Sequence, residues 1–142
     1  MQTTCTVKVK FTAAHRLAGK DIPCEALHGH YYEVSFTFAA EKLEGGMIVE
    51  FEDAERRLQE WFSKNWDHNM ILSDSDKELG EAVSKITKQK VFYYKGCPTA
   101  ENLAAYLLNE VAPKLFADTN GKCVRVKLDE YSKGLYSCEV SL

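Results

Sequence analysis

The residues best suited to chemistry are three of the four histidines, which lie close together in the N-terminal part of the chain. His28 and His30 are separated by one glycine, and His15 precedes them across a short polar loop. Side chains two residues apart on a strand point to the same face, so His28 and His30 can meet His15 from a neighbouring strand. Three imidazoles suit zinc and leave a fourth position open, as in catalytic sites. A single histidine on a strand is more often an ordinary half-buried residue, so the prediction of a zinc site rests on the set.

Cys24 lies beside this cluster in the sequence, and its chemistry has three alternatives. It could be a fourth zinc ligand, a catalytic base or nucleophile, or an inert buried thiol. A nearby metal lowers the pKa of a thiol and makes the thiolate available at neutral pH. The other four cysteines have no chemical neighbours in sequence and are expected to be small core residues.

Two further groups of polar residues have both a chemical and a structural interpretation. Asp67 and His68 are either an orienting carboxylate with a proton-transferring imidazole or a solvated pair at a helix exit. Glu130, at the end of an apolar strand, either pairs with the amidine-like edge of a ring or is a solvated charge. Thr99 is the expected N-cap of a helix, and the helix dipole accounts for Glu101 in its first turn.

Length and composition predict an ordinary globular chain. Its 142 residues predict one domain, residues 1–142, and its 45% apolar and 27% charged residues are typical of soluble proteins. The net charge of −3 and the lack of a basic run argue against nucleic acid, and no apolar stretch is long enough for a membrane span or a signal peptide. Five scattered cysteines form no disulfide framework, which favours the reducing cytoplasm.

Hydrophobic periodicity predicts an α+β fold with helices on one face of an antiparallel sheet. The order of the main elements is strand, strand, helix, helix, strand, strand. A short helix within 73–90 and a short strand at 91–94 are expected between the two helices. The main strands are predicted at residues 4–15, 27–40, 123–130 and 135–142, and the main helices at 51–64 and from Thr99 to the region of Pro113.

Several motifs occur in an order that is specific to one family. The chain contains FTAAHRL (11–17), CEALHGH (24–30), GMIVEF (46–51), WDHNM (66–70), PTAENLA (98–104) and LDEY (128–131). With these motifs it resembles the 6-pyruvoyltetrahydropterin and 6-carboxytetrahydropterin synthases over nearly its whole length. The resemblance implies a T-fold, with a four-stranded antiparallel sheet and two main helices on one face. It also implies assembly edge to edge into a barrel, usually a hexamer of two trimers, with active sites between subunits.

The same resemblance implies roles for individual residues. His15, His28 and His30 would bind Zn²⁺, and Cys24 would be the base. Asp67 and His68 would form a proton relay. Glu130 would hold the pterin ring of 7,8-dihydroneopterin triphosphate, helped by Thr99 and Glu101. The lysines or arginines that bind the triphosphate are not identified by the motifs, although Lys8, Lys10, Arg16 and Lys133 are available.

The residues around the second histidine motif bear on which product is formed. Three residues separate Cys24 from His28, which resembles the bacterial carboxy-type enzymes of queuosine biosynthesis. Glu25 resembles the catalytic carboxylate of a subtype that forms 6-hydroxymethyl-dihydropterin for folate synthesis, or it is a solvated loop acid. The alternatives are therefore a hydroxymethyl or dual product, a pyruvoyl product, and a non-catalytic zinc or pterin-binding protein. A zinc hydrolase acting on a different substrate is a weaker alternative.

Overall fold

A long antiparallel hairpin forms the centre of the fold. The computed structural model describes residues 1–142, and strands β1 (Thr4–His15) and β2 (His28–Ala39) pair along their whole length, from Thr4 opposite Ala39 to His15 opposite His28. The predicted alternation is confirmed, because the side chains on one face are buried while their neighbours are exposed or half-buried at most positions. The buried set on this face includes Val7, Val9, Phe11, Tyr32, Val34, Phe36 and Phe38.

The hairpin belongs to a six-stranded curled sheet with the order β4-β3-β1-β2-β5-β6. Strands β5 (Lys122–Tyr131) and β6 (Leu135–Ser141) extend it with antiparallel pairing, so the predicted four-stranded antiparallel sheet is confirmed. Two short strands, β3 (Asn69–Ser73) and β4 (Phe92–Tyr94), add parallel pairing beside β1. The α+β class is correct. Strand β4 confirms the short strand expected at 91–94, whereas β3 was not predicted, and the two strands widen the sheet beyond the predicted four.

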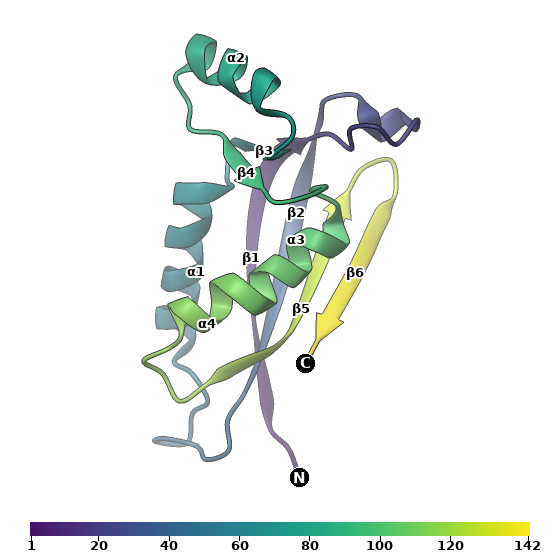
Figure 1. Ribbon diagram of the computed structural model, residues 1–142. Coiled ribbons are helices and arrows are strands. Elements are labelled where there is room, and N and C mark those ends of the chain that lie inside the picture. The colour runs from purple at the N-terminus through teal and green to yellow at the C-terminus, as the bar shows by residue number, and fades with distance from the viewer.

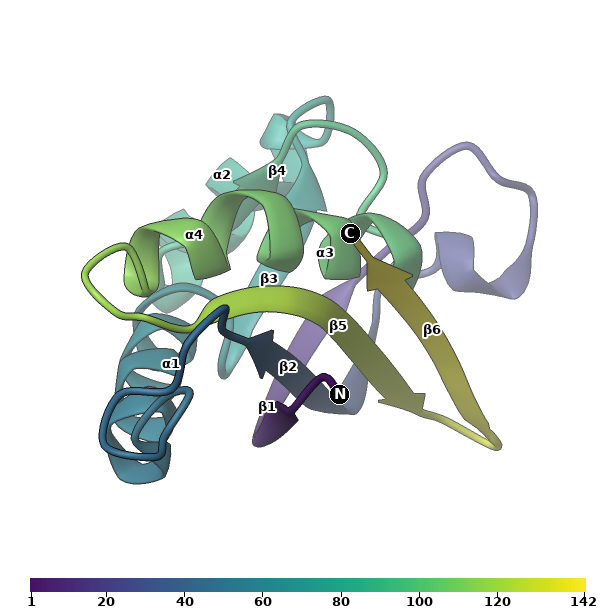
Figure 2. The same ribbon diagram turned by 90° about the horizontal axis from the view of Figure 1, so that it is seen from below.

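Two long helical segments cover one face of the sheet, as predicted (Figures 1 and 2). Helix α1 (Phe51–Asn65) begins at Glu50, whose carboxylate accepts hydrogen bonds from two first-turn amides. The second segment is continuous through α3 (Ala100–Tyr106), a π-helical turn (Leu107–Val111) and α4 (Ala112–Leu115). Pro113 conflicts with regular helical bonding to the preceding turn, and the wider π-turn just before it accommodates the ring.

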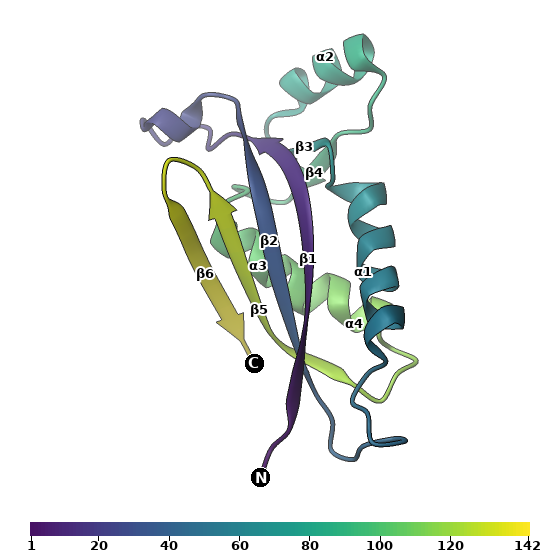
Figure 3. The same ribbon diagram turned by 180° about the vertical axis from the view of Figure 1, so that it is seen from behind.

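The opposite face of the main sheet carries no long helix, as the view from behind shows (Figure 3). The remaining helix, α2 (Lys77–Thr87), lies instead at the β3–β4 end of the sheet (Figure 1). Its Leu79 and Val83 pack on Met70 and Leu72, whereas Ile71 between them belongs to the main core. Because strand side chains alternate, α2 packs against the face of β3 opposite to α1. No helix in the structure is long and apolar enough to cross a membrane.

Candidate active site

The three histidines converge at the end of the β1–β2 hairpin. His15 is the last residue of β1 and lies opposite His28, the first residue of β2, while His30 follows on the same face. One ring nitrogen from each histidine lies within 4.8 Å of the others, and the Nε2 atoms of His15 and His28 are 3.1 Å apart. The predicted convergence on one point is therefore confirmed.

The hydrogen bonds on the far side of each ring define which nitrogen faces the cluster. The Nδ1 atoms of His15, His28 and His30 lie 2.9, 2.7 and 3.1 Å from the backbone carbonyl oxygens of Pro98, Ala26 and Tyr131, respectively. A carbonyl oxygen can only accept, so each Nδ1 carries a hydrogen, and in the neutral ring that binds a metal each Nε2 then presents a lone pair to the cluster. Three lone pairs facing one another repel unless a cation lies between them. The donor set and its outer partners therefore fit a zinc ion.

The burial of His15 and His30 also fits a metal site in which the Nε2 atoms face the ion. Removal from water lowers the pKa of His15 from 6.5 to about 4, and the neighbouring His28 and His30 act in the same direction. His15 is therefore neutral at pH 7, the form that binds a metal. The Nε2 atom of His30 is buried and has no hydrogen-bond partner. A buried polar atom without a partner is rare, and this one points into the cluster.

Glu130 and Tyr32 line the wall beside the cluster. Tyr32 lies opposite Glu130 in the β2–β5 pairing and is the next residue after His30 on the buried face. Glu130 Oε1 is 3.3 Å from His30 Nε2, and the Glu130 side chain is only 16% exposed, so it is not the solvated strand-end charge of the sequence-based alternative. The Tyr32 hydroxyl is buried beside the Glu130 carboxylate, and burial, then the Glu130 charge, raises its pKa. Glu130 is thus a partly enclosed carboxylate that lies against His30 and has no lysine or arginine paired with it.

Cys24 and Glu25 lie on the loop that joins the two histidine-bearing strands. They belong to a single 3-10 turn (Pro23–Glu25), and the loop closes where the Leu17 amide donates to the Cys24 carbonyl at 2.8 Å. Cys24 is half-buried, and its charge would act on the Tyr32 hydroxyl. The Glu25 carboxylate accepts from the Asp21 amide at 3.4 Å within its own loop. The loop therefore brings Cys24 to the histidine side of the sheet, while Glu25 bonds locally.

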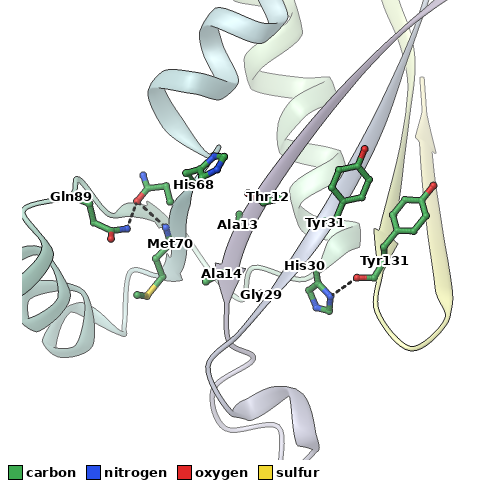
Figure 4. Close-up of a pocket in the computed structure, with 11 residues that line it drawn as sticks. Thr12, Ala13, Ala14, Gly29, His30, Tyr31, His68, Met70, Gln89 and Tyr131 are labelled. Atoms are coloured by element: carbon green, nitrogen blue, oxygen red, sulfur yellow. Dashed lines mark hydrogen bonds between the residues drawn. The ribbon is translucent and has the colours of Figure 1, made fainter.

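Asp67 and His68 do not join this cluster. Asp67 accepts from the Thr12 amide at 3.0 Å, three residues before His15 and so about 10 Å away along β1. His68 Nδ1 lies 3.1 Å from Asp67 Oδ1, a contact between adjacent residues, and the backbone of His68 has a positive φ. The His68 side chain is 82% exposed, and Figure 4 shows it on the other side of β1 from His30.

His68 lines an open pocket of about 460 Å³ beside β1 and β2, and His30 of the histidine cluster lines the same pocket (Figure 4). Tyr31 and Tyr131, whose ring centroids are 5.2 Å apart, and Gln89 are among its lining residues. Neither Cys24 nor Glu130 lines this pocket. His68 therefore lies apart from Cys24 and Glu130, and His30 belongs both to the histidine cluster and to the lining of the pocket beside His68.

Thr99 and Glu101 lie at the start of α3. The Thr99 hydroxyl accepts from the Asn102 amide at 3.2 Å, which confirms the predicted N-cap, and Pro98 just before it supplies the carbonyl that holds His15. Glu101 is exposed in the first turn, and its charge acts on Cys138 of β6. Sequence reasoning missed Tyr32 and the three backbone carbonyls. The alternation of β2 identifies Tyr32 as a neighbour of His30, whereas no sequence signal identifies the carbonyls.

The curled sheet, the two long helices on one face and the histidine cluster define a T-fold protein with a candidate metal centre. A profile of the family described as "6-pyruvoyl tetrahydropterin synthase" matches residues 4–140. The chain belongs to the 6-pyruvoyl tetrahydropterin synthase family, whose members include enzymes that act on pterins.

Relatives and solved structures agree with this assignment. The chain is 42% identical over 127 residues to a protein of Rickettsia typhi named 6-carboxy-5,6,7,8-tetrahydropterin synthase, covering 89% of this chain and 92% of the relative. A protein of the same name from Haemophilus influenzae is 25% identical over 107 residues, covering 71% and 76%. An uncharacterized protein of Wolinella succinogenes has the same fold, with a TM-score of 0.78 at 16% identity, covering 99% and 98%. The 6-pyruvoyl tetrahydropterin synthase of Plasmodium falciparum gives 0.61 at 16% identity, covering 98% and 99%.

Proposed function

We propose that this chain is a zinc-dependent lyase that converts 7,8-dihydroneopterin triphosphate into 6-carboxy-5,6,7,8-tetrahydropterin. One water is consumed, and acetaldehyde and triphosphate leave. The name of the relatives at 42% identity and the histidine cluster support this proposal. We further propose that the enzyme acts in the cytoplasm, in queuosine biosynthesis. Residues 1–142 would form one domain.

The observation that carries the proposal is the orientation of the three imidazole rings. Carbonyl oxygens engage all three Nδ1 atoms, so the Nε2 atoms of His15, His28 and His30 are the ones available to hold zinc. Zinc held there would polarise the side-chain oxygens of the substrate and acidify the adjacent C–H bonds.

The chain's own residues would then bind the ring and move protons. The Glu130 carboxylate would accept two N–H groups from the amidine-like edge of the pterin, since it lies beside His30 and is not paired with a lysine or arginine. Thr99 and Glu101, at the start of α3, would help to hold the ring. Cys24, half-buried on the histidine side, would remove the proton from the substrate side chain.

Asp67 and His68 would act in the active site of a second copy of the chain. They lie about 10 Å along β1 from His15, and the exposed side chain of His68 supports a relay that joins Cys24 of one subunit to His68 of another. This arrangement fits a homo-oligomer, proposed as a hexamer, in which each site combines residues of neighbouring chains.

Mixing two inactive variants tests this assembly. Cys24→Ala and His68→Ala chains are each expected to be inactive alone. After joint unfolding and refolding, mixed oligomers contain some sites with an intact Cys24 and an intact His68, so activity should return. No recovered activity in oligomers that contain both chains, verified by mass spectrometry, would contradict a shared site.

Product identification tests the reaction itself. The zinc-loaded chain is incubated with 7,8-dihydroneopterin triphosphate, and the pterin and any acetaldehyde are identified by mass spectrometry, with the chelator-treated chain as control. The expected product is 6-carboxytetrahydropterin with acetaldehyde, formed only with zinc. The 6-hydroxymethyl product would assign the chemistry to Glu25, and the pyruvoyl product would indicate triphosphate elimination alone. Unchanged substrate, with zinc held by four protein ligands including Cys24, would support a non-catalytic binding protein.

A further inference from the structure

A largely buried ion pair connects the end of β1, the strand that carries His15, to the start of α2. Arg16 directly follows His15, and its Nε and Nη2 atoms lie 2.6 and 2.7 Å from the two carboxylate oxygens of Asp76. The side chains are 32% and 11% exposed, so the pair is largely removed from solvent. This two-bonded geometry is the strong form of an arginine–carboxylate contact. We call it the Arg16–Asp76 pair.

The Asp76 carboxylate forms hydrogen bonds only with Arg16. It precedes α2 at the N-cap position, yet its carboxylate makes no hydrogen bond to the first turn of that helix. Both oxygens are used by Arg16 instead. Asp76 therefore does not cap α2 with its side chain, as an aspartate at this position usually does, but binds Arg16, which is 60 positions away in the sequence.

Few other contacts hold α2 itself to the sheet. Strand β3 pairs with β1 only from Ala13 to His15, and the small apolar cluster beneath α2 has three buried members, Met70, Leu72 and Val91. On the other side, Arg16 begins the loop that ends at Cys24, and it also lies within the electrostatic reach of Glu25. The pair therefore joins the α2 segment to the backbone between a proposed zinc ligand and the proposed base.

We infer that the Arg16–Asp76 pair is a positioning element that fixes His15 and the 16–27 loop for zinc binding. Arg16 would thus not bind the substrate triphosphate, because its guanidinium is already paired. The inference rests on the zinc-binding part of the proposed function. Outer partners that orient metal ligands contribute about 10- to 100-fold in metal affinity, and a pair acting through the backbone should lie near the lower end, about 10-fold.

Three variants and one control test this inference. Arg16→Gln, Asp76→Asn and the double variant remove the pair, while Arg16→Lys keeps the charge without the planar fork. Arg56→Gln is the matched control, because Arg56 forms an exposed ion pair with Asp53 and Glu60 on α1. Zinc affinity is measured by competition with a chromophoric chelator. Hydrogen exchange at the Leu17 amide, which bonds to the Cys24 carbonyl, reports on loop opening in the zinc-free chain.

The expected result is an about 10-fold loss of zinc affinity in each single variant, no further loss in the double variant, and faster exchange at Leu17. Arg16→Lys should fall between wild type and Arg16→Gln, and Arg56→Gln should match wild type. Wild-type zinc affinity in Arg16→Gln and Asp76→Asn would overturn the inference while leaving the zinc site standing. A wild-type chain that takes up no zinc would overturn the proposed function and this inference together.

Discussion

Lowering the pH should destabilise the zinc-free chain through His15. Burial lowers the pKa of His15 to about 4 from 6.5, so below pH 6.5 the unfolded chain binds a proton that the folded chain does not. The contribution of His15 to the free energy of unfolding is therefore fully present above pH 6.5 and is lost progressively as the pH falls toward 4. At pH 5, which is 1.5 units below 6.5, the proton bound by His15 in the unfolded chain lowers the free energy of unfolding by about 2 kcal/mol.

Urea denaturation of the chelator-treated chain at pH 7 and pH 5 measures this loss, and a His15→Asn variant isolates it. An asparagine amide nitrogen can replace Nδ1 in the bond to the Pro98 carbonyl, but it does not titrate. Between the two pH values, wild type should lose about 2 kcal/mol more than His15→Asn. Equal losses in the two proteins would refute the argument that His15 is held neutral by burial.

Three further predictions concern the proposed base, the ring-binding carboxylate and one tight contact. Cys24→Ala should keep its zinc, by metal analysis, while kcat falls about 10²- to 10⁴-fold, and near-normal turnover would remove Cys24 as the base. Glu130→Gln should lower kcat/KM about 10- to 100-fold with zinc content unchanged, because a charged hydrogen-bond acceptor is lost, and an unchanged kcat/KM would contradict ring binding there. Gly80→Ala should cost about 1–3 kcal/mol in urea denaturation, because the new Cβ would lie 2.0 Å from the Tyr93 hydroxyl oxygen; undiminished stability would show that Tyr93 moves aside at little cost.

Local periodicity was sufficient to predict the main elements. The alternation of β1 and β2 predicts which face each histidine occupies, and the helical spacing in 51–64 predicts α1 nearly to its ends. Both signals depend only on near neighbours in the chain. The chemistry of the histidine cluster could be predicted for the same reason, since two of its members lie on one strand.

Features that depend on distant parts of the chain could not be predicted in this way. The short helix and short strand expected between the main helices correspond to α2 and β4, but β3 was not predicted, because it pairs with β1 and β4 through only three residues each, too few for a periodic signal. The position of α2 opposite α1 follows from tertiary packing of Met70 and Leu72. The separation of His68 from Cys24, and the contact of Arg16 with Asp76, are likewise set by the folded arrangement and have no local pattern.

The position of the histidines at the open end of one hairpin has a consequence for the order of folding. His15 and His28 come together when the single loop between β1 and β2 closes. Glu130 joins them only after β5, which lies near the C-terminus, has paired with β2. Contacts of short sequence separation form faster than distant ones. Zinc should therefore begin to bind a partly folded chain in which only the hairpin exists, before the Pro98 and Tyr131 carbonyls are in place to orient His15 and His30. Any such binding to non-native states reduces the stabilisation that zinc gives to the native fold, so a thermal shift will understate its native affinity.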